Sequence, residues 1–365
     1  MSEDRTPSTT PVRVAIVGCG AVAQLYYAPA LRTLEREGLI TLSTVHDPDL
    51  RAVQLFRNEF RSAFSARSID ELLDREPQLV IVASPPSHHA EHTIAALRAG
   101  ADVHCEKPLA PTAAEGELMV AAAAGAGRRL SVGLVRRHFP ATQVIGRLLA
   151  AGTLGDLRSV ECFEGGPFEW PIRSADSFRR SAGGVGLLHD IGTHCVDLLV
   201  WWLGLPTEVA YEDDAMGGIE ANCRIDLRFE SLTATVRLSR DWARPNRYVI
   251  TGTDGWIDWT VNDSNDLHLG LRGAPGRGLA GEHFATALEL HRGTSTTGGG
   301  GLRCRAATFE EAFTDQLRAL TEDQHERRWV AAEAALPTMR ILDECLARRR
   351  TMSMPWLQPD EGAWA

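Results

Sequence analysis

Residues 12–23 read VRVAIVGCGAVA, and this stretch decides the fold. Its first part is mostly apolar and rich in β-branched side chains, which predicts a short strand buried on both faces. Gly18 permits a tight turn, Gly20 lets the backbone approach a pyrophosphate, and Ala23 lets the next helix pack closely on the strand. Because this GxGxxA pattern lies at a strand-to-helix turn, it predicts a dinucleotide site rather than an ordinary glycine turn. The residues predicted to hold the cofactor here are Gly18, Gly20, Ala21 and Val22.

The first third of the chain alternates between predicted strands and helices that are joined by short links. Further strands are expected at residues 39–47, 78–84, within 101–108, and 130–134. The helices expected between them cover residues 21–37, a stretch after Pro48, and residues 68–73, 87–100 and 112–127. This alternation predicts a parallel, doubly wound sheet. We therefore expect a Rossmann domain over residues 12–134, after a polar tail over residues 1–11.

Beyond residue 134 the pattern changes, and residues 135–365 are expected to form a second α/β domain. Helices are expected near residues 137–151 and 187–203, and several strands joined by short turns follow them. Strands in such a series predict a mostly antiparallel sheet. Residues 293–301 read GTSTTGGGG and are expected to form a flexible loop. Two terminal helices are expected near residues 308–325 and 329–350.

Composition and charge exclude several classes of protein. The 365 residues contain 38 Lys and Arg against 48 Asp and Glu, and a net charge of -10 argues against nucleic-acid binding. Seven cysteines without CxxC spacing favour reduced thiols over disulfides or a structural zinc site. The polar N-terminus lacks a secretory signal, and no apolar run is long enough to span a membrane. These features predict a soluble cytoplasmic protein without a membrane partner.

Asp47 ends the second predicted strand and bears on the choice of cofactor. A carboxylate at this position can accept hydrogen bonds from the adenosine ribose, and its charge would repel a 2′-phosphate. NAD(H) is therefore favoured, and NADP(H) stays possible because nearby Arg51 could tolerate the phosphate. An alternative for Asp47-Pro48 is that this pair only caps the following helix.

The segment Glu106-Lys107-Pro108 follows a predicted parallel strand at its C-terminal end, where ligands bind in open α/β sheets. Lys107 could donate a hydrogen bond to a substrate hydroxyl and stabilise alkoxide character during hydride transfer. Most lysines are solvated surface groups, so this segment alone proves little.

Asp190 and His194 are four residues apart in a predicted helix and therefore share one face. Imidazole can take a proton near neutral pH, and a carboxylate one turn away can orient it. On its own the pair could equally be a structural hydrogen bond at a helix end. The glycines expected to let a ligand approach are Gly183, Gly184, Gly186 and Gly192.

Five motifs, in this order, resemble the Gfo/Idh/MocA family, named after glucose–fructose oxidoreductase, inositol dehydrogenase and rhizopine catabolism. They are GCGAVA, VHDPDLRA, SPPSHHAEH, EKPLA and GGVGLLHDIGTHCVDLLVWWLG. The resemblance covers about residues 12–350, and its most specific marks are EKP and D-x-x-x-H. It implies an N-terminal Rossmann domain, a C-terminal α/β domain with a large open-faced sheet, and a site without metal.

The resemblance also implies a role for each matching residue. Lys107 matches the lysine expected to bind the reacting hydroxyl, His194 the proton acceptor, and Asp190 its relay or orienting partner. Residues implied to contact the cofactor are Ser84, Pro85, His89, Glu106 and Lys107. Arg136 matches a position near the substrate where family members often carry arginine, and His189 departs from the more usual apolar residue. From its place in the loop before the Asp190 helix, we also expect Trp170 to line the substrate pocket.

Together these observations predict hydride exchange between NAD(H) and a secondary alcohol or ketone carbon of a sugar, sugar derivative or cyclitol. Two alternatives stay open: a redox-neutral enzyme with tightly bound NAD, such as an epimerase or an oxidative glycoside-cleaving enzyme, and a non-catalytic NAD-binding sensor. Because the family's open sheet commonly pairs with a second copy, a homodimer or homotetramer through the C-terminal sheet is implied. Trp256 and Trp259 could lie in that interface, whereas Trp201 and Trp202 are expected in the core.

Overall fold

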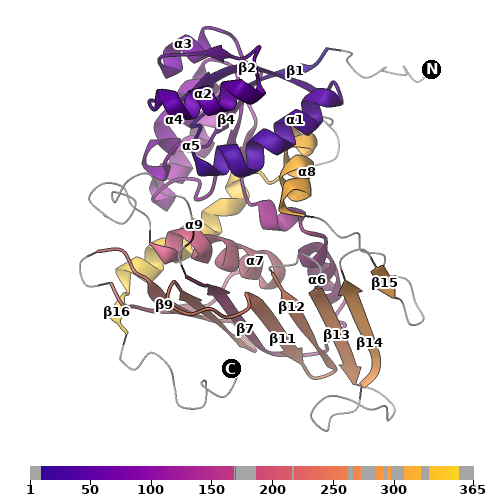
Figure 1. Cartoon of the computed structure of the whole chain (residues 1–365). Helices are drawn as coiled ribbons and strands as arrows, with labels where there is room; N and C mark the ends of the chain where they lie inside the picture. Colours follow the sequence, from indigo (N-terminus) through magenta and orange to yellow (C-terminus); the bar gives the residue numbers. More distant parts are fainter. Residues whose placement is uncertain are drawn as a thin grey trace, which may run out of the picture. The chain divides into compact units, whose positions relative to one another are not determined.

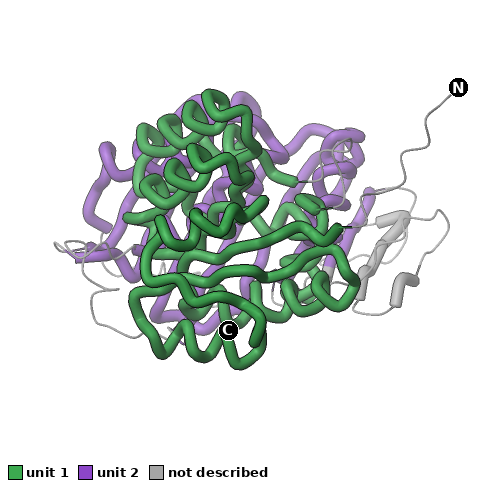
Figure 2. The backbone as a smooth tube through the Cα atoms, turned by 90° about the horizontal axis from the view of Figure 1, so that it is seen from above, with its two compact units in different colours: residues 1–138, 308–336 green, residues 139–307, 337–365 purple. Residues whose placement is uncertain are grey.

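The computed structural model describes residues 10–167, 169, 186–215, 218–261, 266–272, 284–291, 294–296, 308–321 and 329–352. The chain forms two compact units, shown in two colours in Figure 2. Unit 1 comprises Met1–His138 and Thr308–Leu336, and unit 2 comprises Phe139–Ala307 and Pro337–Ala365. The first unit is thus built from two separate stretches of chain, whereas the sequence patterns suggest a single boundary after residue 134.

Unit 1 contains a parallel sheet with the strand order β3-β2-β1-β4-β5-β6. The strands are β1 (Val12–Val17), β2 (Ile40–His46), β3 (Phe64–Ser65), β4 (Leu79–Val82), β5 (Asp102–Cys105) and β6 (Leu130–Val132). β4 is buried throughout because its sequence LVIV is covered on both faces. With β1 between β2 and β4, the order is that of a doubly wound Rossmann fold, so the predicted fold class is confirmed for this part. The sequence patterns do not predict β3, which is very short and pairs with the end of β2.

Three of the described helices in unit 1 begin at a side chain that caps them. The α-helices described in this unit are α1 (Ala28–Arg36), α2 (Leu50–Glu59), α3 (Ile69–Leu73), α4 (His89–Arg98), α5 (Ala113–Ala126) and α8 (Phe309–Thr321). The side chains of Asp49, Ser68 and Thr112 accept hydrogen bonds from backbone N–H groups in the first turns of α2, α3 and α5. α5 ends at Gly127, whose positive φ of 60° favours glycine.

α8 returns to unit 1 because an aromatic cluster binds it there. Tyr26 stacks on Phe313 at 4.9 Å between ring centroids, and the ring of Tyr27 meets Phe313 edge-on at 5.1 Å. The guanidinium of Arg318 pairs with the carboxylate of Glu37, at the C-terminal end of α1, at 2.5 Å. These contacts explain why residues far along the chain belong to the Rossmann unit, which local sequence patterns do not reveal.

Unit 2 contains a sheet with the order β15-β14-β13-β12-β11-β7-β10-β9-β8-β16. The strands are β7 (Leu157–Gly165), β8 (Glu208–Asp213), β9 (Asn222–Arg228), β10 (Thr233–Ser239), β11 (Arg247–Gly252), β12 (Gly255–Thr260), β13 (Asp266–Arg272), β14 (Phe284–His291), β15 (Thr294–Thr296) and β16 (Arg350–Thr351). β7 runs parallel to β10, and β16 runs parallel to β8. All other strand pairings among the described residues of this sheet are antiparallel, so the prediction of a mostly antiparallel second sheet is confirmed.

One face of this sheet is covered by α6 (Pro140–Ala150) and α7 (Thr193–Leu203), as Figure 1 shows. Along β7, the residues Val160, Cys162 and Glu164 are buried and alternate with more exposed neighbours. The indole N–H of Trp202 donates to Thr142 O at 3.1 Å, which links α7 to α6. α9 (Leu336–Ala347) precedes the edge strand β16. None of the helices in the described parts of the chain is long and apolar enough to cross a membrane.

Several expectations for this unit are wrong in detail. Residues 293–301 are not entirely a loop, because residues 294–296 form β15 against β14. Trp201 is 39% exposed rather than part of the core. Trp259 is fully buried and packs against Trp202 and Tyr248, so its ring fills the core of unit 2 rather than the open face. The six cysteines that lie in the described residues are free thiols, and all of them are buried.

Candidate functional site

The glycine turn in unit 1 is packed on one side and open on the other. Gly18 has a φ of +94°, and a Cβ there would lie 2.5 Å from backbone atoms of Ala83 and Ser84. Only glycine fits this position, because both the conformation and the space exclude a side chain. No atom lies within 4 Å of the place a Cβ would take on Gly20. The turn therefore fits the pyrophosphate of a dinucleotide, which needs a close and unobstructed backbone approach.

Asp47, which follows β2, links the end of that strand to the glycine turn by a hydrogen bond. Its Oδ2 accepts a hydrogen bond from the Cys19 N–H at 2.8 Å, and its Oδ1 accepts one from the Asp49 N–H at 2.7 Å. The cap of α2 is Asp49, whose Oδ1 accepts from the Arg51 N–H at 2.9 Å. The alternative in which Asp47 serves only as the helix cap is thus wrong, and its carboxylate stands beside the glycine turn.

The helix that follows the turn begins with a π-helical turn, Ala23–Tyr27. π-helical turns are rare and frequently occur at functional sites. This one brings Tyr27 into contact with the segment after β5: its hydroxyl donates to Glu106 Oε1 at 2.6 Å. The Lys107 N–H donates to the other carboxylate oxygen, Oε2, at 2.9 Å. Both oxygens of Glu106 are therefore engaged within unit 1.

Glu106 belongs to a buried polar network. Tyr27 Oη lies 3.0 Å from His104 Nε2, and Gln316 Nε2 of α8 lies 3.0 Å from the same nitrogen. His104 Nδ1 lies 2.7 Å from Ser131 Oγ. Burial raises the pKa of Glu106 above its ordinary value, while burial lowers the pKa of His104 to about 3. Gly133 is needed beside this network, since a Cβ there would lie 2.9 Å from Glu106 Oε1.

Lys107 follows the carboxyl end of β5, and its backbone N–H connects it to this network through Glu106. The peptide bond between Lys107 and Pro108 is cis. Lys107 is the only lysine in the sequence, and the other 37 of its 38 Lys and Arg residues are arginine. A lysine ammonium is a compact charge on a flexible stem and can release its proton, whereas a guanidinium stays charged. The partly exposed side chain of Lys107 therefore carries the only ammonium group on a lysine side chain in this sequence.

His89 joins the segments after β4 and β5. Its Nε2 lies 2.7 Å from Ser84 O, its Nδ1 lies 2.9 Å from Pro108 O, and the residue is 1% exposed. A neutral imidazole has one N–H and donates to one carbonyl at a time. Burial, the main cause, lowers the pKa of His89. His89 is therefore a buried link between Ser84 O and Pro108 O, beside the exposed Pro85, and its contact with the cofactor stays a prediction.

Asp190 and His194 lie on consecutive helical segments of unit 2. Residues Leu188–Gly192 form a π-helical turn, and His194 follows in the first turn of α7, so the expected continuous α-helix is wrong in its first part. Asp190 Oδ2 forms an ion pair with Arg240 Nη2, from the end of β10. His194 is partly exposed, and its Nδ1 is shielded from solvent. Arg240 is fifty residues away in sequence, so local patterns give no signal for it.

The glycines near this helix have structural roles. A Cβ on Gly186 would lie 2.1 Å from the carboxylate of Glu220, which also accepts a hydrogen bond from the Leu188 N–H at 2.8 Å. A Cβ on Gly192 would meet a methyl group of Leu238 at 3.2 Å. Both glycines thus make room for packing inside unit 2. Gly183, Gly184 and Trp170 lie outside the described residues.

Sequence comparison identifies the relatives of this chain. Residues 12–134 match a family model described as an oxidoreductase family with an NAD-binding Rossmann fold, and residues 142–258 match the GFO/IDH/MocA C-terminal domain. The chain belongs to the Gfo/Idh/MocA family. Membership of this oxidoreductase family accounts for the fold of both units and for the glycine turn described above.

Two curated members of the family illustrate the range of relatives. The chain is 29% identical over 200 residues to scyllo-inositol 2-dehydrogenase (NADP(+)) of Bacillus subtilis, covering 54% of this chain and 53% of that protein. It is 31% identical over 200 residues to D-glucoside 3-dehydrogenase of Escherichia coli, covering 54% and 56%. The chain thus spans about half the length of these relatives. A 3-ketoreductase from Actinomadura kijaniata, solved with NADP and TDP-benzene, shares the fold, with a TM-score of 0.74, 23% identity, and coverage of 95% of this chain and 100% of that one.

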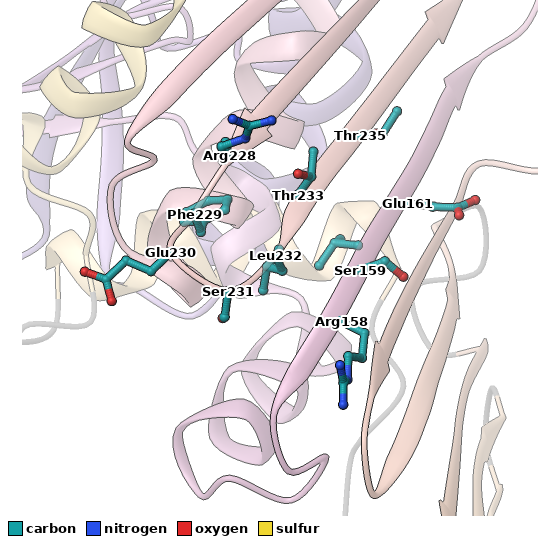
Figure 3. A pocket seen from close by; sticks show the side chains of 11 residues that line it. Arg158, Ser159, Glu161, Arg228, Phe229, Glu230, Ser231, Leu232, Thr233 and Thr235 are labelled. Carbon is teal, nitrogen blue, oxygen red and sulfur yellow. The ribbon is translucent and has the colours of Figure 1, made fainter.

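The predicted site residues are found in both units. Lys107 and Arg136 belong to unit 1, where Arg136 is only 8% exposed, and Asp190 and His194 belong to unit 2. A separate open groove of about 680 Å³ lies on the exposed face of the unit 2 sheet, along β7, β9 and β10 (Figure 3). It is lined mainly by polar side chains such as Glu161 and contains none of the predicted site residues.

Proposed function

We propose that this protein is an NAD(H)-dependent oxidoreductase that interconverts a secondary alcohol and a ketone on a sugar, sugar derivative or cyclitol. The observation that carries the proposal is Lys107, the single lysine of the chain, held by buried Glu106 at the carboxyl edge of a Rossmann sheet. The names of the inositol and glucoside dehydrogenases support the substrate class. The localisation that fits this metabolism is the cytoplasm.

The roles of the residues follow from their chemistry. When bound, the nicotinamide ring would exchange the hydride with the substrate carbon. Lys107 would donate a hydrogen bond to the reacting oxygen and stabilise its developing negative charge. In the oxidative direction His194 would accept the hydroxyl proton, and Asp190, held by Arg240, would orient the imidazole. Arg136 and Trp170 are proposed to bind the rest of the substrate.

NAD(H) is proposed as the preferred cofactor because of Asp47. Its carboxylate is fixed at the glycine turn by two backbone N–H groups, so a 2′-phosphate would meet a negative charge there. The inositol dehydrogenase relative is named for NADP(+) instead. The proposed preference for NAD(H) therefore rests on Asp47 of this chain and not on that relative. The variant Asp47→Ser should lower the KM for NADP+ by about tenfold or more, because like charges brought together cost up to several kcal/mol.

The first experiment follows NADH absorbance with purified protein, NAD+ or NADP+, and a panel of sugars, glycosides, sugar phosphates and cyclitols. For an active substrate, Lys107→Ala and His194→Asn should each lower kcat by about a hundredfold or more. Matched controls are Arg98→Ala, an exposed cation at the end of α4, and His268→Asn on β13. Near wild-type turnover in both site variants would refute the assignment. Product formation without net NADH would instead favour the redox-neutral enzyme.

The single lysine permits a second test that needs no substrate. Protein labelled with ¹³C at the lysine ε-carbon should give one lysine side-chain NMR signal, because the sequence contains a single lysine. Addition of NAD+ should shift this signal if Lys107 lies at the cofactor site. Calorimetry should first show that the protein binds NAD+. If the chemical shift of the Lys107 signal then stays unchanged at saturating NAD+, the proposed position of Lys107 is contradicted.

A further inference from the structure

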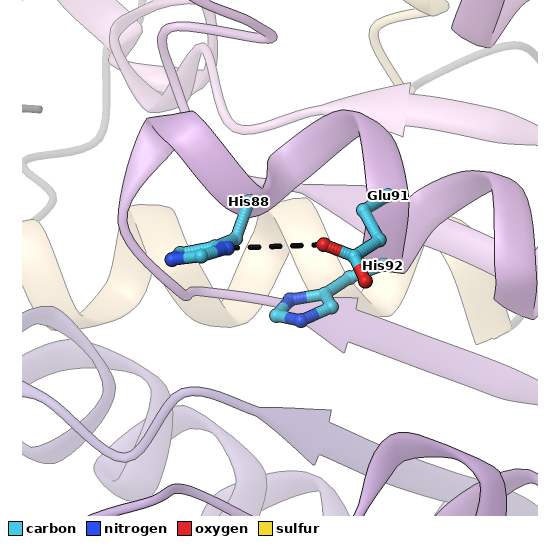
Figure 4. Close-up of side chains that lie close together, drawn as sticks. All are labelled: His88, Glu91 and His92. Carbon is cyan, nitrogen blue, oxygen red and sulfur yellow. Dashed lines mark ion pairs between the residues drawn. The ribbon is translucent and has the colours of Figure 1, made fainter.

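Two histidines and a glutamate lie together where the 3-10 turn Pro86–His88 leads into the first turn of α4, outside the predicted catalytic set. Glu91 and His92 lie three and four residues after His88. Residues at these spacings are neighbours on the surface of a helix. Figure 4 shows the three side chains together. One ligand atom from each lies within 4.8 Å of the other two. No role in hydride transfer requires this cluster.

The three side chains lie close together and are accessible from solvent. The rings of His88 and His92 are nearly parallel, with centroids 5.6 Å apart and 17° between planes. His88 Nδ1 lies 3.9 Å from Glu91 Oε2, the pair joined by the dashed line in Figure 4. The side chains of His88 and Glu91 are 55% and 74% exposed. An ion from solvent can therefore reach the cluster and complete its coordination with water.

His92 has the supporting contact that metal-binding histidines usually have. Its Nδ1 lies 3.0 Å from Ser84 Oγ. If Nδ1–H donates to that hydroxyl, the lone pair on Nε2 is the one available to a metal, and the ring is held in one orientation. Such a partner outside the ligand set fixes the tautomer and the direction of the ring. This contact distinguishes His92 from a histidine that only happens to lie on a helix surface.

We propose that His88, Glu91 and His92 bind one divalent transition-metal ion at the junction of the 3-10 turn Pro86–His88 and α4. Two imidazoles and one carboxylate without thiolate match Zn²⁺ and Ni²⁺ better than Mg²⁺ or Ca²⁺, which prefer oxygen ligands alone. The ion would hold the short 3-10 turn Pro86–His88 to α4 and stabilise the segment that follows β4. This inference is independent of the proposed dehydrogenase activity, because it concerns binding and stability only.

The test is calorimetric titration of ZnCl₂ into untagged, metal-free protein. The wild type should bind one ion at this site, and Zn²⁺ should raise its thermal midpoint. The double variant His88→Ala/His92→Ala should lose both effects, whereas the control His268→Ala should keep them. Glu91→Gln, at an exposed position that tolerates change, should weaken binding without altering the fold. Ser84→Ala should weaken binding by about tenfold to a hundredfold, because it removes the supporting hydrogen bond.

Cobalt substitution separates this cluster from the buried group Cys162, Glu164 and Cys195 in unit 2, which also brings three ligand atoms within 4.8 Å of one another. A Co²⁺ complex of His88, Glu91 and His92 should show ligand-field absorption and no thiolate-to-metal charge-transfer band. A charge-transfer band would assign the metal to the cysteines and overturn the proposal. Unchanged Zn²⁺ affinity in the double variant would overturn it as well.

Discussion

Lys107 and Asp190 are both charged groups proposed for catalysis, yet the two units hold them in different ways. Beneath Lys107, Glu106 is 6% exposed and bonded to Tyr27, and the network continues to His104 and Gln316. Asp190 is held by Arg240 in an ion pair whose side chains are 36% and 22% exposed. Buried polar groups are costly to leave unpaired, whereas exposed ion pairs contribute little to stability. The comparison therefore predicts that mutations under Lys107 affect folding and chemistry together, while mutations behind Asp190 affect chemistry alone.

The largest effect is expected for Glu106→Ala. This change removes the acceptor for the buried Tyr27 hydroxyl and for the Lys107 N–H. The free energy of unfolding should fall by about 1–3 kcal/mol because buried groups lose a hydrogen-bond partner, although the Tyr27 hydroxyl keeps its contact with His104 Nε2. Turnover should fall as well, because Lys107 loses its support. Denaturant unfolding and steady-state kinetics measure the two effects.

Two variants make the Glu106 experiment specific. Glu106→Gln keeps an acceptor for Tyr27 and should lose less stability than Glu106→Ala. Glu117→Ala removes an exposed carboxylate from α5 and should leave unfolding within the range of ordinary surface changes. If Glu106→Ala unfolds like the wild type, the buried network does not hold Lys107 in the way described.

A pH-dependent effect is expected next, from His104 in the same network. Burial lowers the pKa of His104 from 6.5 to about 3. Between these values the unfolded chain binds a proton that the folded chain does not, so stability falls as the pH falls. This group alone should change the unfolding equilibrium by roughly tenfold per pH unit in that window. Urea unfolding of wild type and His104→Gln across the window measures the difference.

The His104→Gln variant should have a flatter dependence of stability on pH below 6.5 than the wild type. The contribution of Glu106 has the opposite sign. Burial raises the pKa of Glu106 above 4.5, so this group contributes stability at low pH that is lost as the pH rises through the raised pKa. Glu106→Gln should therefore steepen the acid dependence that His104 causes. If the free energy of unfolding changes with pH in the same way in both variants and in the wild type, the burial of His104 and Glu106 is contradicted.

A smaller effect is expected for His89, which ties the segments after β4 and β5 with contacts to Ser84 O and Pro108 O. His89→Leu removes the ring nitrogens and should cost about 1 kcal/mol of stability. It should raise the KM for the nucleotide more than it lowers kcat, because the tie positions the cofactor segment without touching the reacting atoms. His89→Asn can restore one of the contacts and should recover part of the loss. A change confined to kcat would point to a direct catalytic role for the ring.

The strand-to-helix motif predicts the Rossmann unit from the sequence because its requirements are largely local. Gly18 is required by a positive φ, a local property of the turn, and also by the close approach of Ala83 and Ser84, which follow β4. The network under Lys107 is different, since Gln316 reaches it from α8 and no local pattern links the two. The same holds for Arg240 and Asp190, which meet only when β10 packs beside the π-helical turn. Short sequence motifs therefore predict Lys107 and Asp190 as candidate catalytic residues. The residues that contact them or their neighbours, such as Arg240 and Gln316, are brought there by tertiary packing and can be identified only from the structure.

Arg240 gives the sharpest contrast with Glu106. Arg240→Ala should change the free energy of unfolding by less than about 1 kcal/mol, because the pair with Asp190 is partly exposed and screened. Its kinetic effect should be clear: removal of a positive charge beside Asp190 favours the protonated form of the neighbouring base, so the acid limb of the pH–rate profile should move to higher pH. Arg240→Lys keeps the charge and should restore most of the wild-type profile. A loss of stability as large as that of Glu106→Ala would show that the two units hold their charged groups in the same way after all.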